Sequence, residues 1–309
     1  MKGTIVRKHL SGVAALLAAA LVLTACGGSS SGSEATAETR EVKHAKGVAE
    51  VPVAPKRVVV LDTGELDDAL ALGVKPVGAV RVDVATDFLS YLGDQTEGIE
   101  EVGTISEPNL EKIAALDPDL ILSSTVRHEA IYEQLNEIAP TVLAPDLGDT
   151  WKDNFLLYAD ALNKTAEAKK MLADFESDAA ALGKTVGAGK TLSIVRFLPG
   201  QIRLYSDKSF SGVILDDMGL SVPEQAVGED TYLEVSPEQI TTADADFVYV
   251  STYGPEGDTD KAKVLGGPLW KRIPAVEAGQ VHDINDDLLS GIGIQAAQQI
   301  LAQFEKELS

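Results

Sequence analysis

Two segments far apart in this chain match each other without a gap. Residues 107–125 read EPNLEKIAALDPDLILSST, and residues 234–252 read EVSPEQITTADADFVYVST. Glutamates, an isoleucine, the two aspartates of a D-x-D turn and a closing Ser-Thr pair fall at matching positions. Each copy has a helical half followed by an apolar run of strand length. The repeat predicts two lobes of similar construction, and facing lobes form a cleft, where ligand sites are commonly found.

Residues 150–182 lie between the two copies and contain neither proline nor glycine. Apolar residues recur there at helical spacing. A single helix of this length would be about 45 Å long, enough to run from one lobe to the other. Elsewhere, short apolar runs alternate with amphipathic segments, which indicates α/β lobes with mainly parallel sheets. We therefore expect an N-terminal lobe at residues 51–149, a spanning helix at 150–183 and a C-terminal lobe at 184–309.

Residues 1–25 have the pattern of a lipoprotein signal peptide. A basic start precedes an apolar run over residues 11–23, which is shorter than the about 20 residues of a spanning helix. The run ends in Leu-Thr-Ala-Cys, which resembles the lipobox of bacterial lipoproteins, and Cys26 is the only cysteine. We expect Cys26 to be lipidated and residues 26–50 to form a flexible tether. The protein would then be extracytoplasmic and attached to the cell membrane by its lipid anchor.

Charge and residue usage exclude several functions. The chain has 48 Asp and Glu against 26 Lys and Arg, a formal net charge of −22, so nucleic acid is not a plausible partner. Residues 51–309 contain no G-x-S-x-G motif, and His44, His128 and His282 form no H-E-x-x-H motif. These scattered histidines also fit a zinc or manganese receptor poorly. We expect no catalytic residues and no metal site of its own, and an exported hydrolytic enzyme is the less favoured alternative.

The lipobox, the paired E-x-x-x-E-x-I…D-x-D segments and the long linking helix resemble one family. This is the class III, or helical-backbone, solute-binding proteins of ABC transporters, and specifically their iron-siderophore branch. The resemblance covers residues 51–309, and the segments most like this branch are residues 124–142, 150–168, 202–220 and 267–284. It implies two Rossmann-like lobes of mainly parallel sheet, joined by one long spanning helix that permits only small closure, with the ligand cleft between them. It also implies a monomer without a cofactor that captures a ferric siderophore and delivers it to an ABC permease dimer.

Arginines are the first candidates for ligand binding. The oxygens of a ferric siderophore already coordinate iron, so the protein needs planar donors and aromatic faces rather than metal ligands. Arg127 and Arg81 each follow a predicted strand, at the carboxyl end where open α/β sheets place ligands. The resemblance implies ligand contacts for Arg127 and, in the C-terminal lobe, for Arg203.

Aromatic residues supply three further candidates. Trp151 begins the predicted spanning helix and could stack on the ligand or cap the helix. Tyr253 follows a C-terminal-lobe strand, at the place that mirrors Arg127 in the repeat, and could donate a hydrogen bond or stack. Trp270 is also a candidate, although its sequence context is more typical of a core residue.

The repeat also predicts the contact with the permease. A two-fold symmetric permease dimer offers equivalent basic sockets, so its binding protein should present one carboxylate on each lobe. Glu111 and Glu238 occupy matching positions in the repeat, and the resemblance implies docking by glutamates of these segments. The alternative is that both belong to ordinary solvated helix faces.

The number of arginines bears on the ligand. A tris-catecholate complex of iron is strongly anionic and favours clustered basic groups, whereas a tris-hydroxamate complex is near neutral. The acidic chain with few arginines favours a ferric hydroxamate. Heme or a corrinoid remains an alternative, because both also suit an aromatic cleft with arginines.

Overall fold

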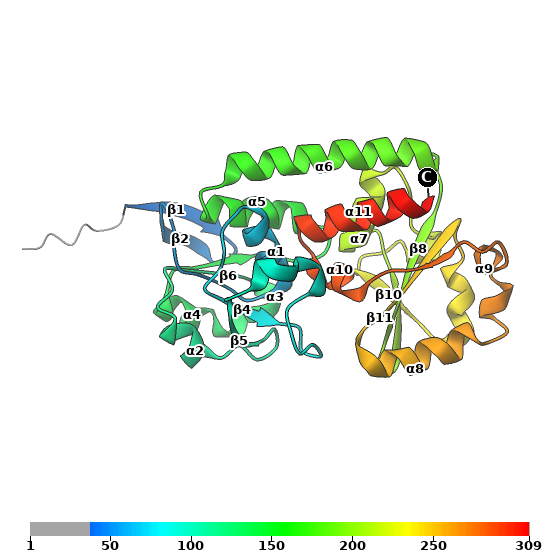
Figure 1. The fold of residues 1–309 in the computed structure, drawn as a ribbon, viewed down its shortest axis with the longest axis horizontal. Coiled ribbons are helices and arrows are strands. Elements are labelled where there is room, and N and C mark those ends of the chain that lie inside the picture. Colours follow the sequence, from blue (N-terminus) through cyan, green and yellow to red (C-terminus); the bar gives the residue numbers. More distant parts are fainter. Residues whose placement is uncertain (1–37, 309) are drawn as a thin grey trace, which may run out of the picture. The chain divides into compact units, whose positions relative to one another are not determined.

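The computed structural model describes residues 38–308, and these contain two five-stranded sheets and one two-stranded sheet (Figure 1). Cys26 and the predicted signal peptide at residues 1–25 lie outside the described residues. None of the helices in the described part is long and apolar enough to span a bilayer.

The sheet of the N-terminal lobe is entirely parallel, with strand order β5-β4-β3-β6-β7. Every residue of β3, β6 and β7 is buried, as expected for strands with helices on both faces. The strands are β3 (Val58–Val60), β4 (Gly78–Arg81), β5 (Glu100–Thr104), β6 (Leu120–Ser124) and β7 (Thr141–Ala144). The helices, with 3₁₀ helices marked η, are α1 (Thr63–Ala71), η1 (Ser90–Thr96), α2 (Leu110–Ala115), α3 (Thr125–His128), η2 (Glu129–Ile131) and α4 (Tyr132–Ile138).

The sheet of the C-terminal lobe is mixed, with strand order β10-β9-β8-β11-β12. Strands β8, β11 and β12 are parallel, whereas β9 pairs antiparallel with β8 and with β10. The strands are β8 (Leu192–Leu198), β9 (Gln201–Tyr205), β10 (Tyr232–Val235), β11 (Phe247–Thr252) and β12 (Val281–Asp283). The helices are α7 (Phe210–Asp217), η3 (Glu224–Ala226), η4 (Pro237–Ala243), α8 (Gly254–Leu265), η5 (Trp270–Arg272), α9 (Pro274–Glu277), α10 (Asp286–Gly291) and α11 (Ile294–Leu308).

The two copies of the sequence repeat occupy equivalent places in the two sheets. Strand β6 lies between β3 and β7, and β11 lies between β8 and β12. Asp119 accepts hydrogen bonds from the backbone nitrogens of Lys56 and Arg57 ahead of β3, and Asp246 accepts one from Thr191 ahead of β8. The second aspartate of each D-x-D turn therefore ties the repeat strand to the start of its central neighbour, and the predicted two-lobed α/β fold is confirmed.

The predicted helix at residues 150–183 is two helices, α5 (Trp151–Ala161) and α6 (Thr165–Val186). Asn163 has a left-handed φ of 57°, and the backbone nitrogen of Lys164 bonds back to Ala159 O at 2.7 Å. This left-handed residue ends α5, a common use of asparagine. The 22-residue α6 alone runs alongside both lobes (Figure 1), over about 33 Å.

The predicted tether at residues 26–50 extends too far along the chain, because residues from 39 onward are folded. Strands β1 (Thr39–His44) and β2 (Gly47–Pro52) form an antiparallel hairpin whose Val42, Ala49 and Val51 are buried. The backbone nitrogen of Ala45 bonds to Leu143 O of β7 at 3.0 Å. These residues therefore belong to the N-terminal lobe, because alternate side chains of the hairpin reach its core.

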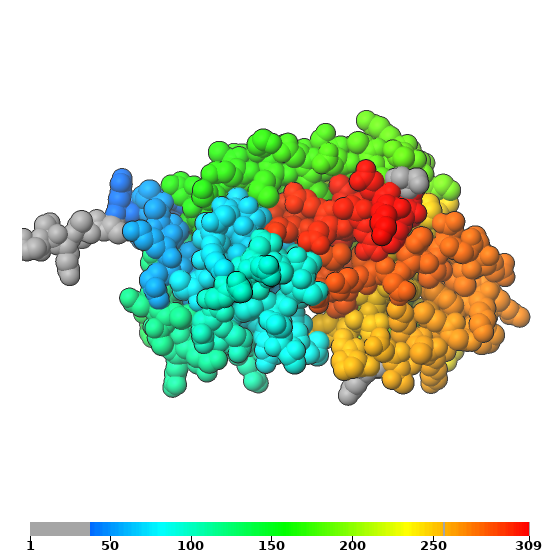
Figure 2. All heavy atoms as spheres, in the orientation of Figure 1, coloured from blue at the N-terminus to red at the C-terminus, as the bar shows by residue number. Residues whose placement is uncertain are grey.

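The C-terminal segment returns from the second lobe to the first. Helix α11 packs against α1 of the N-terminal lobe and against α6 (Figures 1 and 2). Asp67 of α1 accepts hydrogen bonds from the backbone nitrogens of Gln295 at 2.7 Å and Ala296 at 2.9 Å. Asp68 accepts one from Ile294 at 3.1 Å. Two buried carboxylates of one lobe thus satisfy the free nitrogens at the start of α11.

We predict that Asp67→Asn lowers the free energy of unfolding by about 1–3 kcal/mol, because an amide group would face buried N–H donors that now bond to a carboxylate. Urea denaturation followed by circular dichroism measures the change. Asp178→Asn on the exposed face of α6 is the matched control and should stay within about 0.5 kcal/mol of the wild type. Equal effects of the two substitutions would contradict this account of the lobe contact.

Candidate functional site

A cavity of about 420 Å³ lies between the two lobes, within the size range of small-molecule sites. The N-terminal lobe lines it with residues that follow β3, β4, β5, β6 and β7, among them Thr63 at the start of α1. The C-terminal lobe lines it with β8, β9, the start of β10 and the residue after β11, together with the end of α10. Its N-terminal wall therefore lies at the carboxyl ends of the parallel strands, where open α/β sheets place ligands.

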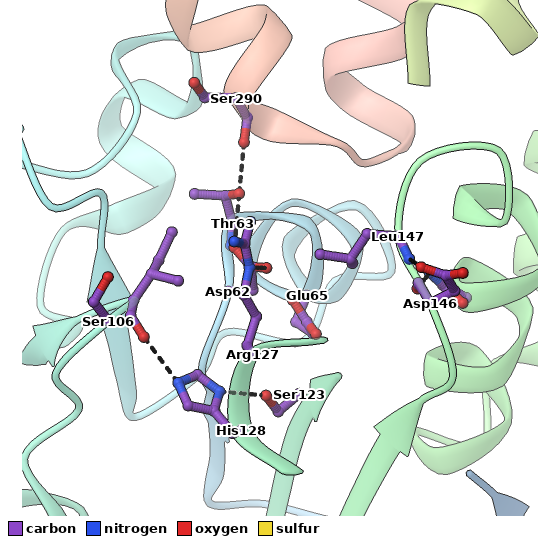
Figure 3. A network of polar contacts seen from close by, with 12 residues as sticks. Asp62, Thr63, Glu65, Ser106, Ser123, Arg127, His128, Asp146, Leu147 and Ser290 are labelled. Atoms are coloured by element: carbon purple, nitrogen blue, oxygen red, sulfur yellow. Dashed lines mark hydrogen bonds and ion pairs between the residues drawn. The ribbon is translucent and has the colours of Figure 1, made fainter. Parts of the chain in front are cut away.

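Arg127 supplies a guanidinium group to the N-terminal wall of the cleft. It lies in α3, directly after β6, and its Nε donates to Asp62 Oδ2 at 2.7 Å (Figure 3). Asp62 is 1% exposed and caps α1. Burial works against the charge on Arg127, but the neighbouring carboxylate of Asp62 outweighs it and raises the pKa of the guanidinium. Within residues 38–308 the two terminal nitrogens of Arg127 have no protein partner, so they remain available to a ligand.

Arg196 organises the opposite wall. It lies in β8 and makes a two-point ion pair with Asp286 of α10, at 2.6 Å from Nε and 2.5 Å from Nη2. Its Nη1 donates to the Tyr205 hydroxyl at 3.0 Å, and its guanidinium lies 4.7 Å from the ring centre of Tyr253. Most of its donors are therefore used within the protein, and it holds two tyrosines against the cleft.

Arg203 is the freer guanidinium of the C-terminal wall. It lies in β9, opposite Arg196 in the strand register, and its Nε donates to Gln201 at 2.7 Å. The guanidinium also lies 4.1 Å from the ring centre of Tyr232. Its two terminal nitrogens have no partner among the described residues, so opposite walls of the cleft each present one guanidinium with free donors.

The sequence-predicted residues fall into two groups. Arg127, Arg203 and Tyr253 line one cavity, although they come from distant parts of the chain. Arg81 lies outside its lining, because its Nη1 donates to the carbonyl oxygens of Val82 and Ala85. It fixes the loop after β4, and two residues of that loop line the cleft.

The two tryptophans are corrected from ligand contacts to core residues. Trp151 is 1% exposed and packs edge-on against Phe175 and Phe210, at ring-centre distances of 5.7 and 5.3 Å. Trp270 is 4% exposed and is not among the residues lining the cleft. Neither indole face is available to a ligand in the cleft.

Three polar or aromatic residues that shape the C-terminal wall were not among the sequence-predicted site residues: Arg196, Tyr205 and Tyr232. Arg196 had a signal, because it interrupts a run of apolar residues in a buried strand, where a charge needs a partner. That partner, Asp286, is far along the chain and carries no motif. The two tyrosines lie in β9 and β10, and antiparallel pairing brings them side by side.

His128 supports the N-terminal wall without facing the cleft. It is buried, and its Nδ1 lies 2.7 Å from Ser123 Oγ while its Nε2 lies 2.8 Å from Ile105 O (Figure 3). Burial lowers the pKa of the imidazole, so the ring is neutral at pH 7 and the carbonyl fixes the hydrogen on Nε2. His128 therefore joins the end of β6 to the Ile105 loop, which lines the cavity.

Glu65 lies beneath the cleft and is 1% exposed. Its Oε1 accepts a hydrogen bond from the Tyr158 hydroxyl at 2.7 Å. Burial, reinforced by the nearby charge of Asp62, raises the pKa of this carboxyl group to about 8. The group is therefore mostly protonated at neutral pH, and it places no second negative charge beside the ion pair of Asp62 and Arg127.

Glu111 and Glu238 are both exposed, in the first turns of α2 and η4. They begin equivalent segments of the two lobes, as the repeat requires. Hydrogen bonds from its own backbone nitrogen and from Ser236 lower the pKa of Glu238, so this carboxylate is charged at neutral pH.

We predict that the stability of the wild type falls as the pH rises from 5 to 9, and that Glu65→Gln flattens this fall. Because the pKa of Glu65 is higher in the folded state, its contribution is complete below about pH 4.5 and is lost as the pH rises through about 8. Urea denaturation at several pH values measures the difference between the two curves, on the order of a few kcal/mol at pH 9. Glu133→Gln, at an exposed position, is the control, and parallel curves for wild type and Glu65→Gln would rule out the assignment.

Comparison with known proteins agrees with this geometry. Residues 58–288 match the model of the periplasmic binding protein family. The chain is 40% identical to the probable siderophore-binding lipoprotein YfiY of Bacillus subtilis, over 97% of this chain and 98% of the relative. It is 34% identical to the Fe(3+)-citrate-binding protein YfmC of the same species, over 91% and 90%.

Among solved structures, Staphylococcus aureus SirA complexed with staphyloferrin B is similar with a TM-score of 0.80 and 31% identity. The match covers 87% of this chain and 98% of SirA. The resemblance to the siderophore branch of class III solute-binding proteins is therefore confirmed. This chain belongs to the periplasmic binding protein family.

Proposed function

We propose that the cleft captures a ferric siderophore outside the cytoplasm and that the protein delivers it to an ABC importer for iron uptake. The observation that carries this proposal is the pairing of Arg127 and Arg203 on opposite walls, each with free terminal nitrogens. Planar donors of this kind suit the oxygen atoms of a chelated metal complex. The tyrosines of the C-terminal wall supply faces for its carbon scaffold, and the iron comes only as part of the ligand. The names of YfiY, YfmC and SirA support this class of ligand.

The charge balance of the cleft favours a ferric complex of low net charge, which retains the hydroxamate type as the first candidate. Arg127 and Arg196 are each neutralised by an aspartate, and Asp83 and Asp146 also line the cavity. Hydrogen bonds from Ser106 outweigh the effect of burial and lower the pKa of Asp83, so this group is ionised. A strongly anionic tris-catecholate complex would meet little net positive charge here. The relatives described above are named for iron complexes, which gives the heme and corrinoid alternative no support.

The lipobox supports an anchored protein. We propose that Cys26 carries the lipid and that the folded part works as a monomer at the outer face of the cell membrane. The lipoprotein name of YfiY supports this location.

We predict saturable quenching of tryptophan fluorescence by one ferric hydroxamate, with weaker quenching by ferric citrate and ferric enterobactin. Arg127→Ala and Arg203→Ala should each weaken binding by about 1–3 kcal/mol, because each removes a charged hydrogen-bond donor. Arg272→Ala makes the same charge change at an exposed residue outside the cleft and should leave binding unchanged.

Two outcomes separate the levels of this proposal. Tight binding of ferric citrate or of a catecholate, with none of a hydroxamate, would correct the ligand type and leave siderophore capture standing. Failure of all the iron complexes to bind would overturn siderophore capture.

We also propose that Glu111 and Glu238 dock the protein onto basic sockets of a permease dimer. Both are exposed and occupy equivalent places in the two lobes, as a two-fold symmetric partner requires. Opposite charges across such a contact raise the rate and specificity of association.

We predict that the double substitution Glu111→Gln and Glu238→Gln reduces iron uptake by cells at least about tenfold while the affinity for the ferric complex is unchanged. Radioactive iron uptake and fluorescence titration measure the two quantities separately. Glu133→Gln with Glu137→Gln is the matched control for charge. Normal uptake by the Glu111 and Glu238 variant would exclude this docking surface.

A further inference from the structure

A chain of hydrogen bonds runs along the lining of the cleft from the N-terminal wall to the C-terminal wall (Figure 3). It begins at Arg127, whose Nε donates to Asp62 Oδ2. The other oxygen of Asp62 accepts from the backbone nitrogen of Thr63 at 2.8 Å. The Thr63 hydroxyl then crosses to the other lobe, donating to the carbonyl oxygen of Ser290 at 2.5 Å.

On the far side, Ser290 belongs to the group that holds Arg196. Its hydroxyl accepts from Arg196 Nη2 at 2.6 Å. Arg196 in turn orients Tyr205 through a hydrogen bond and Tyr253 through its ring face. The position of these tyrosines is therefore linked to Arg127 through Thr63.

The crossing point is closely packed. Asp62 and Thr63 are 1% and 3% exposed, and the bond between the lobes joins the buried Thr63 to the half-buried Ser290 at the lining of the cleft. A hydrogen bond from a buried donor is less screened by water than one between two exposed groups. A Cβ added at Gly64 would lie 3.2 Å from Ile292 O, which shows how near the two backbones come.

Contacts at the rims of the cleft are of a different kind. Val84 lies near Gly254, and no polar side-chain atom takes part in this contact. Lys208 Nζ lies 3.6 Å from Asp149 Oδ2, and both side chains are more than 40% exposed. An exposed ion pair of this type contributes little. These two rim contacts can therefore shift at small cost, whereas the Thr63 contact, together with the hydrogen bonds from Ser90 to Asp287 of α10, resists a change in spacing.

We propose that Thr63 is a positioning residue for ligand recognition. Its bond to Ser290 fixes the distance between Arg127 on one wall and the Tyr205 and Tyr253 pair on the other. The cleft thereby selects among ferric complexes by their width. The selection rests on the proposed function, whereas the coupling between the walls is a property of the ligand-free protein.

The first test compares Thr63→Val, which removes the hydroxyl at nearly constant volume, with Thr63→Ser, which keeps it. Thr63→Val should weaken the preferred complex about tenfold, as expected for the loss of one hydrogen bond, and should weaken poorly fitting complexes less. Thr63→Ser should stay within about twofold of the wild type. Urea denaturation shows that each variant is folded. Equal weakening of every complex, or no weakening, would overturn the role in selection.

The second test needs no ligand. Side-chain ¹⁵N spectra resolve the Nε–H signal of Arg196, and Arg127→Ala should shift this signal in the wild type but not in Thr63→Val. If Arg127→Ala, introduced into the wild type, does not shift the Arg196 Nε–H signal, the coupling is overturned, whichever complexes the protein binds. A signal that responds, in a protein that binds no ferric complex, supports the coupling and removes only the proposed function.

Discussion

The close approach of α1 to the corner between α10 and α11 is the contact on which the rest of the described structure depends. Two glycines make it possible. A Cβ at Gly293 would lie 2.6 Å from the side chain of Asp67, and a Cβ at Gly291 would collide with the hydroxyl of Tyr91, a residue of η1 that bonds to Asp67. At this spacing, the buried carboxylates of α1 reach the first nitrogens of α11. The lobes are therefore joined by buried hydrogen bonds as well as by α6, and a wide opening of the cleft would have to break them.

Helix α1 and its cap accommodate buried carboxyl groups in two ways, and one of them forms part of the site. Asp62 is balanced by a guanidinium. Burial raises the pKa of Glu65 to about 8, that of Asp67 to about 7 and that of Asp68 well above its usual value, although Asp67 and Asp68 also accept hydrogen bonds from backbone nitrogens of α11. Only the first solution reaches the cleft. Arg127 thus carries two roles, since it compensates a buried carboxylate on one side and presents donors to the cavity on the other.

The sequence predicted what depends on periodicity and on strand order. The repeat placed β6 and β11 in matching positions, and the rule for strand ends found Arg127 and Tyr253. The sequence could not predict features that depend on partners far along the chain. Arg81 follows a strand as Arg127 does, but its side chain turns to carbonyls of its own loop. Trp151 begins the helix that was expected to join the lobes, yet a place at the start of a helix does not show which face of that helix is buried. The break at Asn163 also escaped detection, because a single left-handed residue leaves the apolar spacing unchanged on both sides.

The acidity of the chain limits how the cleft can bind. A net charge of −22 gives an anionic solute no long-range attraction, and the aspartates behind Arg127 and Arg196 cancel most of their short-range attraction. What remains is direction, because Arg127 and Arg203 present free N–H groups that point along fixed lines. Recognition must then depend on whether the oxygen atoms of the ligand lie in the directions of these N–H groups and whether the carbon scaffold of the ligand packs against the tyrosine rings. A site of this kind discriminates by geometry, and its geometry is only as precise as the joint between the lobes.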